Sequence, residues 1–110
     1  MEGQQTLLRI FIGESDHHGG KALYEAIVER LRREHLSGCT VLRGIEGFGA
    51  KSVLHTASIL RLSQDLPIVI EAVDTPENIE RVLPAVEEMV GDGLITLETV
   101  RVIRYGVKGQ

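Results

Sequence analysis

The chain has 110 residues, enough for one domain but not for two, so a single domain over residues 1–110 is expected. Hydrophobic residues at 43% and charged residues at 25% are typical of globular proteins in water, and aromatic residues at only 4% predict an aliphatic core. A net charge of -4 and a pI near 5.5 argue against nucleic-acid and anionic-membrane partners. Residues 1–5 lack the basic region of a signal peptide, and no apolar run approaches the roughly 20 residues of a membrane span. A cytoplasmic protein with no membrane insertion is therefore expected.

The first elements in chain order are a strand and a helix. Residues 7–12 show the alternation of a strand with largely apolar side chains on both faces. After a polar turn at residues 13–20, apolar residues recur at helical spacing from Ala22 to Leu31, opposite charged ones. This pattern predicts an amphipathic helix that ends before Gly38, with a cap in that region. His35 is then expected to interact with the carbonyls and dipole at the helix end, and the lone Cys39 is predicted to be a small core residue.

Two further strands surround a long connection. They are predicted at residues 40–43 and 67–73, where proline in the first strand position is permitted. The segment Gly44 to Leu66 is long for a hairpin connection, and such length usually accompanies function. Leu54, Ala57 and residues 60–62 fit either a helical turn or a backward extension of the third strand, and the pattern does not decide between them.

The last part of the chain predicts a second helix and a fourth strand region. Thr75 and Pro76 are typical of a helix start, and apolar residues then hold a 3.6-residue period up to Val90. Pro84 interrupts this helix, which predicts a kink or an unravelled turn. The apolar stretch 94–103 changes phase near residues 98–99, which predicts two short strands or one bulged strand.

The order strand, helix, strand, strand, helix, strand predicts an α+β fold of the ferredoxin-like βαββαβ type. In this fold a four-stranded antiparallel sheet carries two helices on one face. Because the strands at residues 7–12 and 67–73 carry apolar side chains on both faces, the second face also needs a cover. Another copy of the chain is the simplest cover, so a homo-oligomer with cyclic symmetry is expected.

A glycine-rich stretch follows the second predicted strand. Gly44, Gly47 and Gly49 lie between two cations, Arg43 and Lys51, and glycine amides can approach an anion closely. The stretch is not a Walker loop, because an extra residue, Ala50, separates the last glycine from the lysine. It is not a dinucleotide fingerprint either, because residue 52 is serine where the third glycine should stand. A phosphate site and a bulge or turn without any ligand both remain open for these residues alone.

A second glycine cluster, Gly91-Asp92-Gly93, ends the second predicted helix and precedes the last strand. Arg101 and Arg104 lie near the end of that strand. Considered alone, the cluster fits a helix C-cap followed by a turn, with solvated arginines.

The element order and three of its motifs resemble the PII signal-transduction proteins. These motifs are 46–49 (Glu-Gly-Phe-Gly), 91–93 (Gly-Asp-Gly) and 102–104 (Val-Ile-Arg). The chain is more closely similar to the PII-like family of unknown function, a set of small bacterial and archaeal proteins, over nearly its whole length. The stretches that carry this second resemblance are 20–25, 40–49 and 65–71.

The resemblance implies a homotrimer that binds a nucleotide in the clefts between subunits. By position, Gly47, Phe48 and Gly49 would line one wall and Gly91, Asp92 and Gly93 the opposite wall, across a subunit boundary. Arg104 matches a phosphate-contacting arginine, and Lys51 and Arg101 complete the candidate nucleotide-binding set. The implied ligand is an adenine nucleotide, namely AMP, ADP, ATP or cyclic AMP. The implied partner is an unidentified regulated protein, such as a membrane transporter or an enzyme, contacted through the segment Gly44 to Leu66.

The sequence departs from the PII pattern at three points. Leu94 stands where PII proteins carry a lysine, and the region of Tyr105 and Gly106 replaces a second terminal arginine. A weaker hold on phosphate is expected, so nucleotides with fewer phosphates suit the site as well as ATP. The segment 44–66 contains no tyrosine, so uridylylation is not expected.

Two other classes of function compete with a nucleotide sensor. His17, His18 and His55 could bind a divalent metal, as in the cation-tolerance proteins of related trimeric fold, but their spacing matches no metal motif, and no metal is expected. A structural or adaptor trimer without a ligand is the second alternative. No enzymatic activity is expected, because Ser15, Asp16 and His17 are consecutive and cannot converge from separate elements as a catalytic relay requires.

Overall fold

The computed structural model describes residues 1–49 and 65–106. Its elements in chain order are β1 (Gly3–Gly13), β2 (His17–His18), β3 (Lys21–Ala22), α1 (Leu23–Arg33), β4 (Thr40–Arg43), β5 (Pro67–Asp74), α2 (Pro76–Met89) and β6 (Leu94–Val102). Expectations for Lys51, Leu54, His55, Ala57 and residues 60–62 fall outside the described residues.

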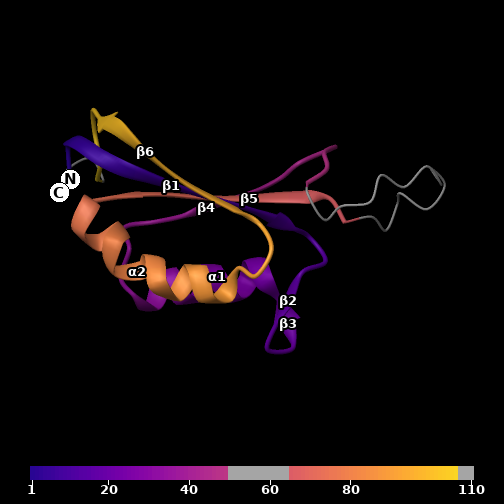
Figure 1. The fold of residues 1–110 in the computed structure, drawn as a ribbon. Helices are drawn as coiled ribbons and strands as arrows, with labels where there is room; N and C mark the ends of the chain where they lie inside the picture. Colours follow the sequence, from indigo (N-terminus) through magenta and orange to yellow (C-terminus); the bar gives the residue numbers. More distant parts are fainter. Residues whose placement is uncertain (50–64, 107–110) are drawn as a thin grey trace.

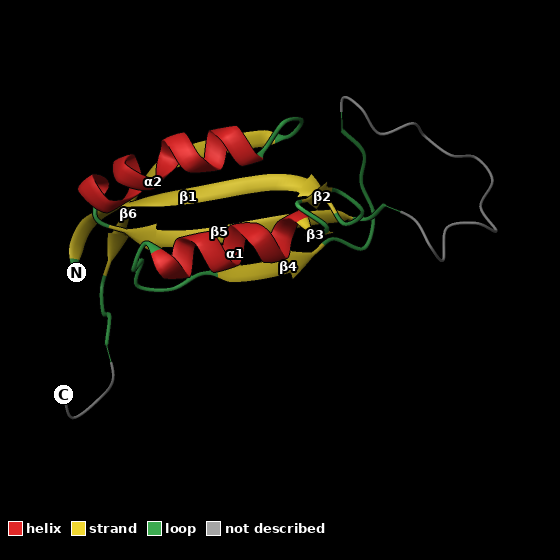
Figure 2. Cartoon of the chain, turned by 90° about the horizontal axis from the view of Figure 1, so that it is seen from below, coloured by secondary structure: helices red, strands yellow, loops and turns green. Residues whose placement is uncertain are grey.

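The main sheet has the strand order β4-β5-β1-β6, and every neighbouring pair is antiparallel. Both helices lie on the same face of this sheet (Figures 1 and 2). Since β1 and β5 occupy the centre of the sheet and β4 and β6 its edges, the topology is that of the split βαβ motif. The predicted α+β, ferredoxin-like fold is confirmed.

The core lies between the sheet and the helices. Residues of β1 alternate, so that Leu8, Ile10 and Ile12 point toward the helices while Leu7, Arg9 and Phe11 point to the other face. The predicted aliphatic core is present, and it is formed by Leu8, Ile10, Ile12, Leu23, Ile27, Leu31, Ile68, Ile70, Ala72, Ile79, Val82, Val86 and Val90. Cys39 packs against this cluster as a partly buried residue, and burial raises the pKa of its thiol.

The face of the sheet away from the helices is called the open face below. The strand register places one apolar side chain from each strand in a single row across it, in the order Leu42, Val69, Phe11, Leu94. Leu42 is 48% exposed and Leu94 is 54% exposed. In the next row, the Arg9 Nε lies 2.8 Å from Glu71 Oε2, and its Nη1 lies 3.3 Å from Glu98 Oε1. The open face is thus apolar along this row, and the ion pairs of Arg9 lie next to it.

α1 ends differently from the expectation. Its C-cap is Glu34, and the next residue, His35, takes the left-handed conformation with φ 65° that usually falls to glycine. Gly38, expected in the cap region, has no such φ value. The main chain of His35 closes the helix, because its N–H donates to the Arg32 carbonyl at 3.0 Å.

α2 begins as predicted. Thr75 is the N-cap, and its Oγ1 accepts from the Asn78 N–H at 3.1 Å, while Pro76 occupies the first turn. The helix runs through Pro84 without interruption, so the unravelled turn is not found. Pro84 is exposed, so water can reach the Glu80 carbonyl that the missing N–H leaves free.

Two strand features differ from the sequence reading. β6 is one strand whose register with β1 continues without a bulge from Leu94 opposite Phe11 to Val102 opposite Gly3. The polar turn contains the small hairpin β2–β3, which projects on the helix side of the sheet (Figure 1). Gly19 and Gly20 both have positive φ, as a two-residue hairpin turn requires.

Asp74 joins the end of β5 to the start of α2. It is only 3% exposed, and its carboxylate accepts from the Ser37 N–H, the Thr75 N–H and the Asn78 side-chain amide, each at 2.7 Å. Burial alone would raise the pKa of Asp74, but these hydrogen bonds together lower it below its ordinary value.

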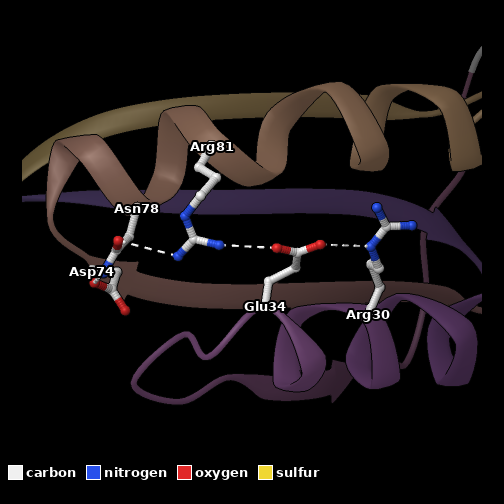
Figure 3. Close-up of polar contacts among 5 residues, drawn as sticks. All are labelled: Arg30, Glu34, Asp74, Asn78 and Arg81. Carbon is white, nitrogen blue, oxygen red and sulfur yellow. Dashed lines mark hydrogen bonds and ion pairs between the residues drawn. The ribbon is translucent and has the colours of Figure 1, made fainter.

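A polar chain continues from Asp74 across the two helices (Figure 3). The Asn78 side-chain oxygen accepts from Arg81 at 3.1 Å, and Arg81 also contacts Glu34 at 2.9 Å. Glu34 in turn accepts from Arg30 at 3.0 Å. The chain connects the C-terminal end of α1 to the N-terminal half of α2.

Candidate functional site

A pocket of about 700 Å³ lies at the end of the sheet where β1 and β4 end and β5 and β6 begin. Its volume lies within the range of small-molecule sites, about 300–1,000 Å³. It is called the glycine pocket below. The described residues that line it are Phe11, Ile12, Gly13, Asp16, Gly47, Phe48, Gly49, Asp65, Pro67, Gly91, Asp92, Gly93 and Leu94.

Strand register brings the two predicted glycine clusters together in this pocket. Pro67 pairs with Gly13 and Leu94 pairs with Phe11, so the segments next to these residues meet at the same end of the sheet. The sequence reading placed the clusters across a subunit boundary, whereas here both line a pocket of one chain.

Close packing accounts for glycine at two of these positions. A Cβ on Gly93 would lie 2.6 Å from the Phe11 carbonyl oxygen and 2.9 Å from a Val90 methyl group. A Cβ on Gly47 would lie 3.0 Å from the Pro67 ring. By contrast, a Cβ on Gly91 would meet nothing within 4 Å, so packing within the chain does not require glycine there.

The polar part of the pocket is acidic. Asp16, Asp65 and Asp92 line it, and no lysine or arginine does so among the described residues. One Asp16 oxygen accepts from the Gly13 N–H at 3.0 Å, and one Asp65 oxygen accepts from the Ser15 N–H at 2.8 Å. Any phosphate bound here depends on backbone amides and on cations from outside this set.

The predicted arginines lie at the other end of the sheet. Arg104 lines a second pocket of about 350 Å³ with Ser37 and Tyr105, whose hydroxyl donates to the Ser37 carbonyl at 3.2 Å. Arg104 is ten positions after Leu94 in the sequence, and β6 alone carries the chain about 26 Å from Leu94 to Val102. Arg101 is exposed near the end of β6, where its main chain pairs with Gln4. Neither arginine meets the glycine pocket of its own chain, and Lys51 lies outside the described residues.

Phe48, which was predicted in one wall, lines the pocket but is 80% exposed. Its neighbour Ile45 is 94% exposed. Sequence reasoning missed the contributions of Phe11, Asp16, Asp65 and Pro67, although the 65–71 stretch was singled out. These residues lie at or next to strand ends, and they could have been assigned to the pocket only with knowledge of the strand register.

The histidines form no metal centre in the described part of the chain. His17 and His18 are adjacent exposed residues of β2, and successive strand residues point to opposite sides. Within residues 1–49 and 65–106, no group of three or more histidine, cysteine, aspartate or glutamate side chains is placed to hold a metal ion. His55 lies outside those ranges.

Neither described helix has the length and apolar character needed to cross a membrane.

Comparison with solved structures shows the same fold in a ligand-bound protein. The chain matches the structure of CPII bound to ADP and bicarbonate, from Thiomonas intermedia K12, with a TM-score of 0.62. The match covers 92% of this chain and 90% of that chain at 20% sequence identity. At this identity the match establishes the fold.

Comparison of sequences gives closer relatives. A UPF0166 protein of Methanocaldococcus jannaschii is 41% identical over 89% of this chain and 91% of its own length. A UPF0166 protein of Aquifex aeolicus is 40% identical over 91% of this chain and 94% of its own length. The family DUF190, described as an uncharacterized ACR, matches residues 5–102. With nearly the whole chain covered by the family and by such relatives, the protein belongs to the DUF190 (UPF0166) family and has a PII-like fold.

Proposed function

We propose that the protein is a non-enzymatic nucleotide sensor that binds an adenine nucleotide in the glycine pocket and regulates a partner protein through the segment Gly44 to Leu66. The observation that carries the proposal is the meeting of Gly47-Phe48-Gly49 and Gly91-Asp92-Gly93 around one pocket of about 700 Å³. The pocket borders the start of the long segment, so a ligand there contacts the residues from which the segment departs. The ADP bound to CPII, which has the same fold, supports the same ligand class.

The pocket can supply two kinds of contact to such a ligand. Phe11, Ile12, Pro67 and Leu94 offer apolar surface for a base, and the glycine-rich turns offer backbone N–H groups for phosphate oxygens. Three carboxylates line the same pocket, so the phosphate charge needs a cation from elsewhere.

A neighbouring copy supplies this cation in the proposed assembly. Arg104 lies at the opposite end of the sheet from the carboxylates of the glycine pocket. A head-to-tail ring therefore places Arg104 of one copy beside the glycine pocket of the next. The open face, with its row of apolar side chains, provides the surface on which copies pack. We propose a trimer, in which three such contacts close the ring.

Isothermal titration calorimetry of the purified protein with AMP, ADP, ATP and cyclic AMP tests the proposal. We expect saturable heat with at least one of the four, and no heat with any of them would overturn it. In that case a structural or adaptor trimer becomes the better description.

A matched pair of variants tests the contribution from the neighbouring copy. Arg104→Gln should weaken ADP binding by about tenfold, because it removes a charge-assisted contact to phosphate. Arg32→Gln makes the same change on the exposed side of α1 and should leave binding unchanged. Equal affinities in the two variants would remove Arg104 from the site.

A further inference from the structure

The turn at residues 13–16, called the pocket turn, is bonded to the chain on both sides of the segment between β4 and β5. Its Glu14 N–H donates to the Leu66 carbonyl at 2.8 Å, and the next amide, that of Ser15, donates to Asp65 Oδ1 at 2.8 Å. Two successive amides of the turn thus hold the residues that lead into β5.

The same turn holds the residues that leave β4. Glu14 Oε2 lies 3.1 Å from the Nε of Arg43, the last residue of β4. The following residue, Gly44, donates its N–H to the Pro67 carbonyl at 2.7 Å. Glu14 therefore contacts both legs of the long segment, one through its backbone and the other through its side chain.

The pocket turn is also a wall of the glycine pocket. Gly13, Asp16 and Asp65 line that pocket, and Glu14 does not. A Cβ on Gly13 would lie 2.5 Å from Asp65 Oδ1, so only glycine lets this carboxylate sit against the turn. On its far side, the turn is fixed to α1, because the Leu23 N–H donates to the Asp16 carbonyl at 2.7 Å.

Through these contacts, a displacement of the pocket wall acts directly on the residues at the two ends of the segment between β4 and β5. If a ligand moves Gly13 or Asp65, the amides of Glu14 and Ser15 move with them, and the Glu14 carboxylate changes its position relative to Arg43. Resting on the proposed function, we propose that the pocket turn transmits ligand occupancy to the segment between β4 and β5, with Glu14 as the positioning residue that couples the pocket to Arg43. A ligand has this effect only by binding differently to the two arrangements of the turn.

Glu14 permits a clean test because its side chain lies outside the pocket lining. The full-length protein is titrated calorimetrically with ADP, and amide hydrogen exchange of residues 43–49 is measured with and without ADP. In the unmodified chain, ADP should change the exchange rates of these amides by about two- to fivefold, the range expected when an exposed ion pair is gained or lost. In Glu14→Ala, ADP should still bind, and most of this change should disappear.

Arg43→Gln removes the other partner of the pair and should have the same effect. Glu88→Ala, which removes an exposed carboxylate from α2, should keep the full response. An undiminished response in Glu14→Ala and Arg43→Gln would overturn the inference.

A ligand-free experiment separates this inference from the proposed function. Gly13→Ala pushes a methyl group against the Asp65 carboxylate and displaces the pocket wall without any nucleotide. It should increase amide exchange at residues 43–49 by about two- to fivefold when Glu14 is present and by much less when Glu14 is alanine. If no nucleotide binds, the proposed function fails, but this experiment still tests whether Glu14 couples the pocket wall to Arg43. Equal increases with glutamate and with alanine at position 14 would overturn the inference. Circular dichroism confirms that each variant is folded before exchange is measured.

Discussion

At the scale of single residues, the two glycines around Asp92 have different roles despite their similar sequence context. The position of a Cβ on Gly93 is occupied by backbone, whereas that on Gly91 is open. Backbone cannot move aside as a flexible side chain can. Packing therefore requires glycine at position 93 but not at position 91.

Gly93→Ala should therefore destabilise the protein by about 1–3 kcal/mol, the usual cost of forcing an extra methyl group into a packed site. Gly91→Ala should leave the free energy of unfolding within about 0.5 kcal/mol or raise it slightly, since alanine restricts the unfolded chain. Urea denaturation of both variants measures the difference. Equal stabilities would show that the contact between residue 93 and the Phe11 carbonyl is relaxed at no cost.

Asp74 gives a pH-dependent prediction. Its folded-state pKa is lowered, so its carboxylate stabilises the fold at pH values above its unfolded pKa, about 3.9, and this contribution is lost as the pH falls through the lower folded value. Asp74→Asn keeps the size of the side chain but replaces one acceptor oxygen with a donor. It should destabilise the protein at pH 7 by about 1–3 kcal/mol, because one buried donor loses its acceptor.

The same variant should differ less from the unmodified protein as the pH falls below about 3.9, because the unfolded chain then binds a proton that folded Asp74 takes up only at lower pH. Urea denaturation at pH 7 and pH 3 measures both differences. A loss of stability that is equal at the two pH values would mean that the charge of Asp74 does not contribute.

At the scale of elements, the sequence predicts best where a helix or strand has one buried face. β5, in which every second residue is buried, was placed within one residue, and the Thr75 cap and Pro76 marked the start of α2 correctly. β4 was also placed at its observed bounds, although all four of its residues are exposed. β6 was misread because apolar and polar residues do not alternate regularly along it. Leu94, Leu97 and Glu98 are all exposed, so its residues follow no simple alternation.

For the candidate site, the sequence showed the local motifs but not how they come together. Both glycine clusters were visible as motifs, but their meeting in one chain depends on Leu94 lying opposite Phe11 and Pro67 opposite Gly13. These register contacts join residues far apart in the sequence, and no local pattern encodes them. The β2–β3 hairpin was missed for a different reason, because His17, His18 and Lys21 are not typical strand residues.

Pro84 offers a test at the level of a helix. It occupies a helical position on the exposed side of α2 and leaves the Glu80 carbonyl without its helical donor. Pro84→Ala restores that hydrogen bond and should stabilise the protein by about 2 kcal/mol, after allowing for the greater freedom of the unfolded chain. Glu87→Ala on the same helix is the control and should change stability by less than about 0.5 kcal/mol. Thermal and urea denaturation compare the two, and no gain for Pro84→Ala would mean that proline is needed where it stands.

At the scale of the whole molecule, the open face links the fold to the proposed assembly. Helices cover one face of the sheet, while Leu42 and Leu94 stay about half exposed on the other. Charged and apolar side chains share this face, and Arg9 is already paired with Glu71 and Glu98. A second copy can therefore pack on the face without burying an unpaired arginine, which would cost several kcal/mol.

Leu42→Lys tests whether copies pack through this face. The side chain is 48% exposed in the single chain, so the substitution should cost the monomer little, yet it places a charge within the proposed interface. Analytical ultracentrifugation should give about 36 kDa for the unmodified protein, three times the chain mass of 12.1 kDa, and a shift toward the single-chain mass for Leu42→Lys. Val41→Lys is the matched control, because Val41 is the preceding residue of β4, is 37% exposed, and points to the helix side of the sheet. A monomeric unmodified protein, or equal masses for the two variants, would rule out the open face as the contact between copies and would leave Arg104 without a route to the acidic pocket.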